Sequence, residues 1–331
     1  MSGLELKAPK PEWLRVKLAG GARYAGLKQQ FRELGLATVC EEAHCPNIGE
    51  CWGEGTATIM ILGDVCTRGC RFCAVKSGNP KGVTDTAEPV NTAKALAAMD
   101  LAYVVLTMVD RDDIPDGGAA HVAETVAEIH ARCPEMLVET LLGDFQGNLD
   151  DVATVIRNGR PDVFAHNVEV VPRLQRRIRD ARCSWERSIS VLEGAKAAGA
   201  AVTKSSIMVG IGETEEEVYD ALEALRDADV DVVTLGQYLR PSKKYAPVDR
   251  YVEPAEFDRY KAAGLAMGFR FVASGPLVRS SYRAAEAFMT GMLRRDPTPP
   301  PAALSSHTAG PGTLSPPAMD RYGKKHLAVL R

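Results

Sequence analysis

The sequence predicts an α/β fold in which a parallel β-sheet is covered by helices. From Thr56 onward, short runs rich in β-branched residues alternate with longer amphipathic segments, which gives six or seven β-α units in series. Such a series favours a parallel sheet, because consecutive parallel strands need a crossover that is usually helical. Right-handed crossovers leave two architectures, an open doubly wound sheet or a full or partial barrel. In both, ligands bind at the carboxyl ends of the strands.

Each unit begins with an apolar run and continues into a helical pattern. The predicted strands are Ala57–Leu62, Ala102–Thr107, Met136–Thr140, Asp162–His166, Ala201–Met208, Val230–Leu235 and Phe269–Ala273. The predicted helices are Val90–Met99, Ala119–Ala131, Leu149–Arg157, Trp185–Ala198, Glu215–Ala228 and Pro254–Met267. Thr214 with Glu217 has the spacing of a capping box, which predicts where one of these helices begins.

The two ends of the chain differ from this core. Residues 1–55 show one helical stretch near Tyr24–Leu34 and then the first cysteines, so we expect an appended N-terminal cap. Residues 56–275 form the predicted barrel, and residues 276–295 form a C-terminal segment. Residues 296–331 are expected to be a disordered tail, because seven prolines between residues 296 and 317 interrupt any pattern that would pack a core.

Composition excludes several classes of protein. Hydrophobic residues at 45% and charged residues at 25% are typical of a soluble globular protein. The longest apolar runs, such as Tyr103–Leu106, are far shorter than the roughly 20 residues of a membrane span. Basic residues number 40 against 43 acidic ones, which gives no excess of positive charge for nucleic acid or membrane binding. Met1–Leu14 carries Glu5 and Glu12 and no apolar signal-peptide core, so we expect a cytoplasmic location.

Six of the eight cysteines lie between Cys40 and Cys73, and this concentration indicates a metal site or catalysis. Cys66, Cys70 and Cys73 have C-x3-C-x2-C spacing directly after the first predicted strand. Three thiolates can hold three irons of a four-iron cluster and leave the fourth iron open to a small molecule. The alternative is a zinc knuckle or a set of buried thiols, but structural zinc favours four ligands in paired spacing.

A second triplet, Cys40, Cys45 and Cys51, has C-x4-C-x5-C spacing and again offers three thiolates. Two incomplete triplets indicate two clusters. The alternatives are one shared site with six ligands, or a zinc site that His44 completes.

The first triplet, with Phe72 before its last cysteine, resembles the radical S-adenosylmethionine superfamily. The second triplet, together with Arg279-Ser-Ser-Tyr282, narrows the resemblance to the lipoyl synthase family, and similar stretches extend from about residue 12 to about residue 290. The resemblance implies a partial parallel (β/α) barrel of about six β/α units with N-terminal and C-terminal extensions. It also implies an enzyme with two [4Fe-4S] clusters that uses S-adenosylmethionine as a source of the 5′-deoxyadenosyl radical. Its reaction would insert two sulfur atoms at carbons 6 and 8 of a protein-bound octanoyl-lysine.

Residue roles follow from the same resemblance. Cys66, Cys70 and Cys73 would bind the catalytic cluster. Cys40, Cys45, Cys51 and Ser281 would bind an auxiliary cluster that donates its sulfur, with Ser280 the second choice for the serine. From the residues alone, these serines are typical of a helix N-cap.

The resemblance also implies partner proteins. These are octanoylated carrier domains of 2-oxoacid dehydrogenase acyltransferase subunits and of glycine cleavage, an electron donor such as ferredoxin or flavodoxin, and an iron–sulfur carrier that rebuilds the auxiliary cluster. Arg173–Arg182 holds five arginines and one aspartate, which indicates either a docking face for an acidic carrier or a solvated helix face.

Further candidates for cofactor contact lie at predicted strand ends. Thr107 ends the second strand and Asp110 follows it, and the resemblance implies that they contact the methionine portion of S-adenosylmethionine; the alternative for this acidic loop is a solvated turn. Asn167 and Glu169 follow the fourth strand, where a carboxylate is suited to the ribose hydroxyls of the same cofactor. Lys204 lies within the fifth strand, and we expect it to point into the barrel mouth. Cys133 and Cys183 have no motif partners, so we expect them to be bystander thiols.

Two other functions compete with this interpretation. One keeps the radical chemistry but delivers sulfur to a free small molecule. The other is an iron–sulfur scaffold or electron carrier without radical chemistry, which would need eight good ligands where the motifs offer six cysteines.

Overall fold

The computed structural model describes residues 9–15, 25–26, 28–29, 37–38, 48, 57–99 and 101–281. The second cysteine triplet, the helical stretch near Tyr24–Leu34 in large part, and the proline-rich tail lie outside these residues. The predicted cap, C-terminal segment and tail therefore stay predictions. The predicted core, by contrast, is described almost completely.

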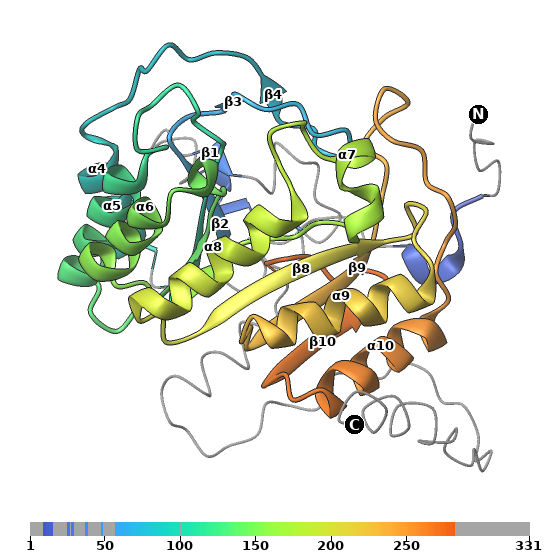
Figure 1. Cartoon of the computed structure of the whole chain (residues 1–331). Helices are drawn as coiled ribbons and strands as arrows, with labels where there is room; N and C mark the ends of the chain where they lie inside the picture. The colour runs from blue at the N-terminus through green and yellow to red at the C-terminus, as the bar shows by residue number, and fades with distance from the viewer. Residues whose placement is uncertain are drawn as a thin grey trace. The chain divides into compact units, whose positions relative to one another are not determined.

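An eight-stranded sheet organises this core (Figure 1). In spatial order its strands are β1 (Ala37–Thr38), β2 (Ala57–Ile61), β5 (Tyr103–Met108), β6 (Leu137–Leu141), β7 (Val163–Ala165), β8 (Thr203–Val209), β9 (Val232–Gln237) and β10 (Phe271–Gly275). All neighbours pair in parallel except β1, which runs antiparallel to β2. The seven predicted strands are confirmed, and within the described residues the ladder ends at β10 without closing back on β1. The fold is therefore a partial barrel.

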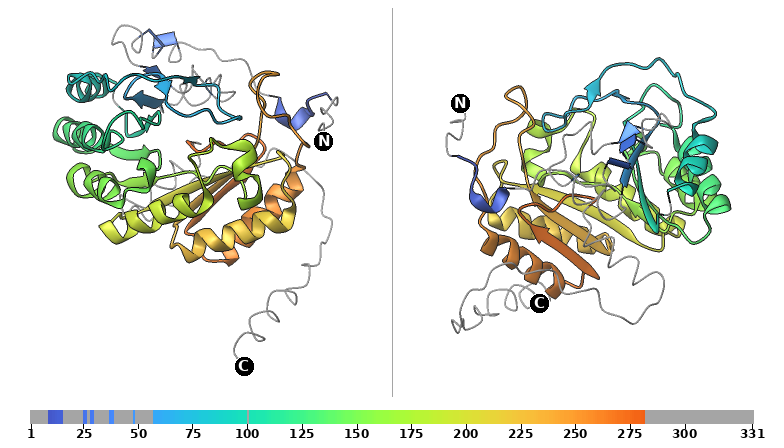
Figure 2. Two further views of the ribbon diagram at one scale, coloured as in Figure 1. Left: turned by 45° about the horizontal axis from the view of Figure 1, so that its top comes forward. Right: turned by 180° about the vertical axis from the view of Figure 1, so that it is seen from behind.

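Helices follow the strands and line the outside of the curved sheet (Figure 2). The long helices are α4 (Glu88–Ala97), α5 (Ala119–Arg132), α8 (Trp185–Ala198), α9 (Glu215–Asp227) and α10 (Pro254–Ala266). Shorter elements are η1 (Glu12–Leu14), η2 (Phe145–Gly147), α6 (Leu149–Thr154), the π-helical turn η3 (Val155–Gly159), η4 (Pro172–Leu174) and α7 (Gln175–Ile178). All six predicted helices are confirmed, although the pattern at Leu149–Arg157 divides between α6 and η3.

Local sequence signals explain where these helices begin and end. Thr214 caps α9 with a complete capping box, in which its side chain accepts from the Glu217 amide and the Glu217 carboxylate accepts from the Thr214 amide. Ser184 caps α8 through the Arg187 amide, and Gly199 ends that helix in a left-handed conformation. Among the described helices, none is long and apolar enough to cross a membrane.

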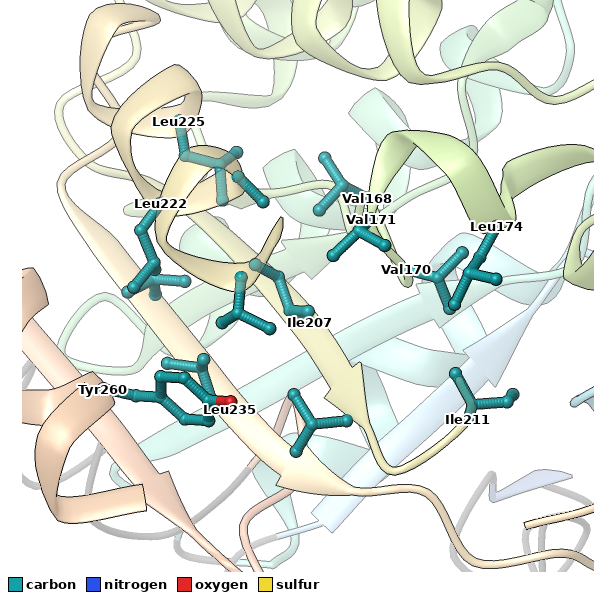
Figure 3. Close-up of a cluster of buried hydrophobic side chains, with 14 of the residues drawn as sticks. Val168, Val170, Val171, Leu174, Ile207, Ile211, Leu222, Leu225, Leu235 and Tyr260 are labelled. Carbon is teal, nitrogen blue, oxygen red and sulfur yellow. The ribbon is translucent and has the colours of Figure 1, made fainter. Parts of the chain in front are cut away.

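The strands bury both of their faces, because successive side chains alternate between the two sides of the sheet. On the outer side, Ile207 and Leu235 pack with Leu222 and Leu225 of α9 and Tyr260 of α10 (Figure 3). A matching outer cluster joins β2, β5 and β6 to α4 and α5. Inside the barrel, an apolar layer fills the end where the strands begin, and its buried members are Tyr103, Val105, Val163, Val202 and Val232. This layer leaves the opposite end, where the strands finish, for a ligand.

Candidate functional site

A cavity of about 240 Å³ lies at the carboxyl ends of the strands, where parallel barrels bind their ligands. Seven of the predicted site residues line it: Cys66, Cys70, Cys73, Thr107, Asp110, Asn167 and Glu169. They come from the ends of β5 and β7 and from the loop after β2, so the sheet brings together residues that are about a hundred positions apart. The cavity is the candidate active site.

The three thiols of the first triplet lie on one folded loop. This loop contains the paired strands β3 (Val65–Cys66) and β4 (Lys76–Ser77), and the Cys73 amide donates to the Cys70 carbonyl at 3.2 Å. Two backbone amides approach the sulfurs, that of Arg68 at 3.4 Å from Cys66 Sγ and that of Asp180 at 3.3 Å from Cys70 Sγ. N–H donors of this kind stabilise thiolates, which are the form that binds iron.

Electrostatics around the bare thiols favour the protonated form. Burial raises the pKa of Cys66 to about 11, with a further contribution from Asp110. The pKa of Cys73 is also raised, mainly by burial, and that of Cys70 is raised mainly by its hydrogen bond to Cys183. A positively charged metal centre reverses this preference, because coordination removes the thiol proton.

A buried arginine connects the cysteine loop to two other strand ends. The Arg68 side chain is 1% exposed, and its Nη2 donates to Asp112 at 2.8 Å and to Asp144 at 2.6 Å. Its Nη1 lies 3.5 Å from Asp110 Oδ1 and 3.4 Å from Cys183 Sγ. Arg68 therefore holds the loops after β2, β5 and β6 in one arrangement.

Asp110 is the acidic residue after β5 that lines the cavity. Its Oδ2 is 4.0 Å from Cys66 Sγ, and burial raises the pKa of its carboxyl group to about 6. Its backbone carbonyl accepts from the amide and the hydroxyl of Thr67, both at 2.9 Å. Gly143 makes room for it, because a Cβ there would lie 2.3 Å from Asp110 Oδ1.

Asn167 and Glu169 form a pair at the end of β7. Asn167 Nδ2 donates to Glu169 Oε1 at 3.1 Å, and burial raises the pKa of Glu169. The Glu169 backbone has a φ of 66°, a left-handed conformation that is uncommon outside glycine. Such strain persists where surrounding contacts hold it, and here the Glu169 carbonyl accepts from Met208 at 2.8 Å.

The cavity lining also includes Asp144, His166, Arg179 and Cys183, none of which was predicted as a site residue. His166 bonds to the Leu142 carbonyl at 2.9 Å and to Ser188 Oγ at 3.0 Å, and burial lowers its pKa to about 4. Within the described residues, Asp144 Oδ2 and Arg179 Nε are buried without a hydrogen-bond partner. The position of His166 at the end of a predicted strand could have identified it as a site residue. The other three residues stand in no sequence motif that could have identified them.

The structure corrects the prediction for Lys204. Its ammonium group does not point into the barrel mouth but lies among the first residues of the strands, where it donates to Glu139 Oε1 at 2.7 Å and Oε2 at 2.8 Å. Tyr103 donates to the same carboxylate at 2.6 Å. The Lys204 side chain is 1% exposed because this pair belongs to the packed end of the barrel. The lysine is therefore a core ion pair.

The prediction that Cys183 is a bystander thiol is also corrected, because Cys183 lines the cavity beside Cys70. Of the two serines in the C-terminal motif, Ser280 lines the cavity and Ser281 does not. The chain reaches this point by passing close to β9, where a Cβ on Gly236 would lie 2.0 Å from the Val278 carbonyl oxygen.

The donor set fits an iron–sulfur cluster. Three thiols converge on one cavity, and Arg179 Nε, which has no hydrogen-bond partner among the described residues, leaves a polar group in its wall for a further ligand. In the part of the chain that the structure describes, no three His, Cys, Asp or Glu side chains are arranged to hold a single metal ion.

Two models of known protein families match parts of this chain. Residues 60–236 match the family model of the radical SAM superfamily, and residues 4–45 match that of the N-terminal domain of lipoyl synthase of the radical SAM family. The second match covers Cys40 and Cys45, which the structure does not describe.

Curated relatives extend the match to nearly the whole chain. A lipoyl synthase of Sorangium cellulosum is 58% identical over 339 residues, covering 98% of this chain and 88% of the relative. A mitochondrial lipoyl synthase of Ostreococcus lucimarinus is 56% identical, covering 86% of this chain and 72% of the relative. Among solved structures, the FeFe-hydrogenase maturase HydG from Carboxydothermus hydrogenoformans shares the fold with a TM-score of 0.52 at 15% identity, covering 66% of this chain and 52% of that one.

Proposed function

Because the chain belongs to the lipoyl synthase family of the radical SAM superfamily, we propose that it inserts two sulfur atoms at carbons 6 and 8 of a protein-bound octanoyl-lysine, forming the lipoyl cofactor. The observation that carries this proposal is the convergence of Cys66, Cys70 and Cys73 on one cavity at the strand ends. The octanoyl carbons that react carry no acidic hydrogen, so acid–base groups alone would not activate them.

Cys66, Cys70 and Cys73 would bind the catalytic [4Fe-4S] cluster. When bound, this cluster supplies the electron that cleaves S-adenosylmethionine at its sulfonium centre. The protein's own contribution is positional: the Arg68 and Asp180 amides donate to the sulfurs, and Arg68 fixes the loop against Asp112 and Asp144. The buried wall also limits the access of water to a reactive site.

S-adenosylmethionine would bind in the rest of the cavity. Asp110 and Thr107 lie on the side of β5, where the Asp110 carboxylate is suited to the amino group of the methionine portion. Asn167 and Glu169 lie at β7, where an amide and a carboxylate are suited to ribose hydroxyls. Glu169 already accepts from Asn167, so one of its oxygens is oriented before the ligand arrives.

A second cluster would be held by Cys40, Cys45, Cys51 and Ser281 and would supply the sulfur. Ser281 does not line the catalytic cavity, which is consistent with a separate site for it. A serine oxygen is a weaker partner for iron than a thiolate, and this suits a cluster that must be dismantled.

The proposed protein partners are octanoylated carrier domains, a one-electron donor of the ferredoxin or flavodoxin type, and an iron–sulfur carrier that rebuilds the second cluster. The proposed location is the cytoplasm, because the chemistry needs cysteines that are kept reduced.

The test is anaerobic. The protein is reconstituted with iron and sulfide, and dithionite, S-adenosylmethionine and an octanoyl-lysyl peptide are added. Mass spectrometry is then expected to show a product that has gained two sulfur atoms. Cys66→Ala and Cys45→Ala should each abolish it, while Cys133→Ala, a thiol outside the cavity, serves as the matched control.

The assignment of Ser281 to the second cluster is tested by a separate variant. Ser281→Ala is expected to remove sulfur transfer while cleavage of S-adenosylmethionine continues. Cleavage without any sulfur transfer by the unaltered protein would contradict the proposed substrate. Absence of cleavage in a protein loaded with both clusters would contradict the radical chemistry as well.

A further inference from the structure

A strongly basic surface surrounds the outer side of the cysteine loop. Three segments form it: residues 69–73, residues 173–179 on η4 and α7, and residues 240–246 after β9. Together they carry eight basic residues and no Asp or Glu: Arg71, Arg173, Arg176, Arg177, Arg179, Arg240, Lys243 and Lys244. The acid next to them, Asp180, accepts from the Gly69 amide and is paired with Arg182. The whole chain has a formal net charge of −3, so this surface contrasts with the rest of the molecule.

Hydrogen bonds join the three segments at Arg71. Its backbone amide donates to the Ile178 carbonyl at 2.7 Å, and its guanidinium Nη1 donates to the Arg177 carbonyl at 3.1 Å. Its own carbonyl accepts from the Ala246 amide at 2.8 Å. Figure 1 shows α7 and the segment after β9 on the same side of the molecule as β4, which closes the cysteine loop. The basic surface is therefore continuous.

Some of these charges serve the fold. Arg173 donates to Glu217 at 2.6 and 2.8 Å, Arg179 is buried, and Arg240 donates to the Tyr245 carbonyl at 3.0 Å. Within Arg173–Arg182, some arginines are therefore engaged by the fold and are not free for a partner. The helix in this segment, α7, spans only Gln175–Ile178.

Other charges remain for a partner. Arg176, Arg177, Lys243 and Lys244 are exposed, and the described part of the chain offers none of them an ion pair. Lys244 Nζ lies 4.9 Å from the Tyr245 ring centroid, a contact that leaves its charge at the surface.

We propose that this basic surface, defined by Arg71, Arg176, Arg177, Lys243 and Lys244, docks an acidic electron-donor protein with a flavin or iron–sulfur centre. Arg71 lies between Cys70 and Cys73, so a protein bound here sits directly against the loop that holds the catalytic cluster. In each event the donor loses one electron and the cluster gains it, and no bond or proton changes place. The inference rests on the proposed function, because that function requires the electron.

Distance favours an electron donor over a carrier domain at this surface. Electron transfer slows steeply with separation, so a donor has to bind beside the cluster. An octanoyl-lysine arm is long, so a carrier domain can bind farther away and still deliver its chain to the cavity. Opposite charges across such an interface mainly accelerate association and lose their effect as salt is added.

The test compares two electron sources. Full-length Arg176→Glu/Arg177→Glu and Lys243→Glu/Lys244→Glu are reconstituted and checked for iron content against the unaltered protein. The control, Lys94→Glu/Lys261→Glu, makes the same change of charge on α4 and α10. Formation of 5′-deoxyadenosine is followed with reduced flavodoxin, an acidic one-electron protein, and separately with dithionite.

With flavodoxin, kcat/KM is expected to fall about tenfold or more in both surface variants and to lose much of its salt dependence. With dithionite the rate should not change, and the control should match the unaltered protein with both donors. An unchanged rate with flavodoxin, or an equal loss with both donors, would overturn the proposal. So would a rise in KM for an octanoylated carrier domain with flavodoxin dependence intact, since that result assigns the surface to the carrier. The dithionite reaction of the unaltered protein tests the proposed function separately.

Discussion

Replacing Lys204 by methionine is expected to destabilise the protein without weakening cofactor binding. Lys204 and Glu139 have side chains 1% and 0% exposed, so the substitution leaves a carboxylate buried with the Tyr103 hydroxyl as its one remaining donor among the described side chains. Removing one partner of a buried ion pair costs about 3–5 kcal/mol of the free energy of unfolding. Anaerobic urea unfolding measures this loss, and equilibrium dialysis measures the affinity for S-adenosylmethionine.

The double variant Lys204→Met/Glu139→Leu separates this explanation from a general packing defect. With both charges gone, the loss is expected to be well below the sum of the two single losses, because neither charge is left uncompensated. A Lys204→Met protein of normal stability that no longer binds S-adenosylmethionine would refute the placement of this lysine in the core.

Three further predictions concern the site and its supports. Burial, and then Arg179, lower the pKa of His166 to about 4, so the unfolded state binds more protons than the folded state below pH 6.5. The free energy of unfolding should therefore fall by about 3 kcal/mol between pH 6.5 and pH 4. Urea unfolding of His166→Gln should not show this pH-dependent loss. Arg68 neutralises buried carboxylates beside the cysteine loop, so Arg68→Gln should lose iron on reconstitution. Arg68→Lys should retain part of the iron, with a shifted midpoint potential. Iron analysis measures the first effect and electrochemical titration the second. Thr214→Ala should lower the free energy of unfolding by about 1 kcal/mol through loss of the capping box. Adding Glu217→Ala to this variant should cost less than Glu217→Ala costs alone, because both residues belong to the same capping box.

The sequence predicted the long elements of the fold because their patterns are long enough to be periodic. Most of these strands and helices have five residues or more, enough for an apolar run or an amphipathic face to be visible, although β7 has only three. Strands β1, β3 and β4 have two residues each, and the four-residue helix α7 barely completes one turn, so none of them carries a period. They form because hydrogen bonds from neighbouring segments hold them, as the Ile178 carbonyl accepts from Arg71.

The site was predictable where strand ends and motif spacing meet. Thr107, Asp110 and Asn167 could be placed together because parallel strands finish at one edge of the sheet. Cys183 could not, because its contact with Arg68 joins residues 115 positions apart through side chains alone. Lys204 shows a different limit: the alternation of a strand gives the side on which a residue lies, but the layer along the barrel depends on register, here with Ala165 and Val232.

The two sides of the cysteine loop differ in their charge, and this arrangement bears on how the reaction is supplied. On the inner side, Asp110, Asp144 and Glu169 line the cavity together with the guanidinium groups of Arg68 and Arg179. On the outer side, Arg71 and the exposed basic residues around it form no ion pair with an acidic residue that the structure describes. An acidic protein is therefore attracted to the outside of the loop more strongly than to the cavity. An electron donor and an octanoylated carrier that used these two sides would not compete, so reduction of the cluster could proceed while the substrate chain stays bound.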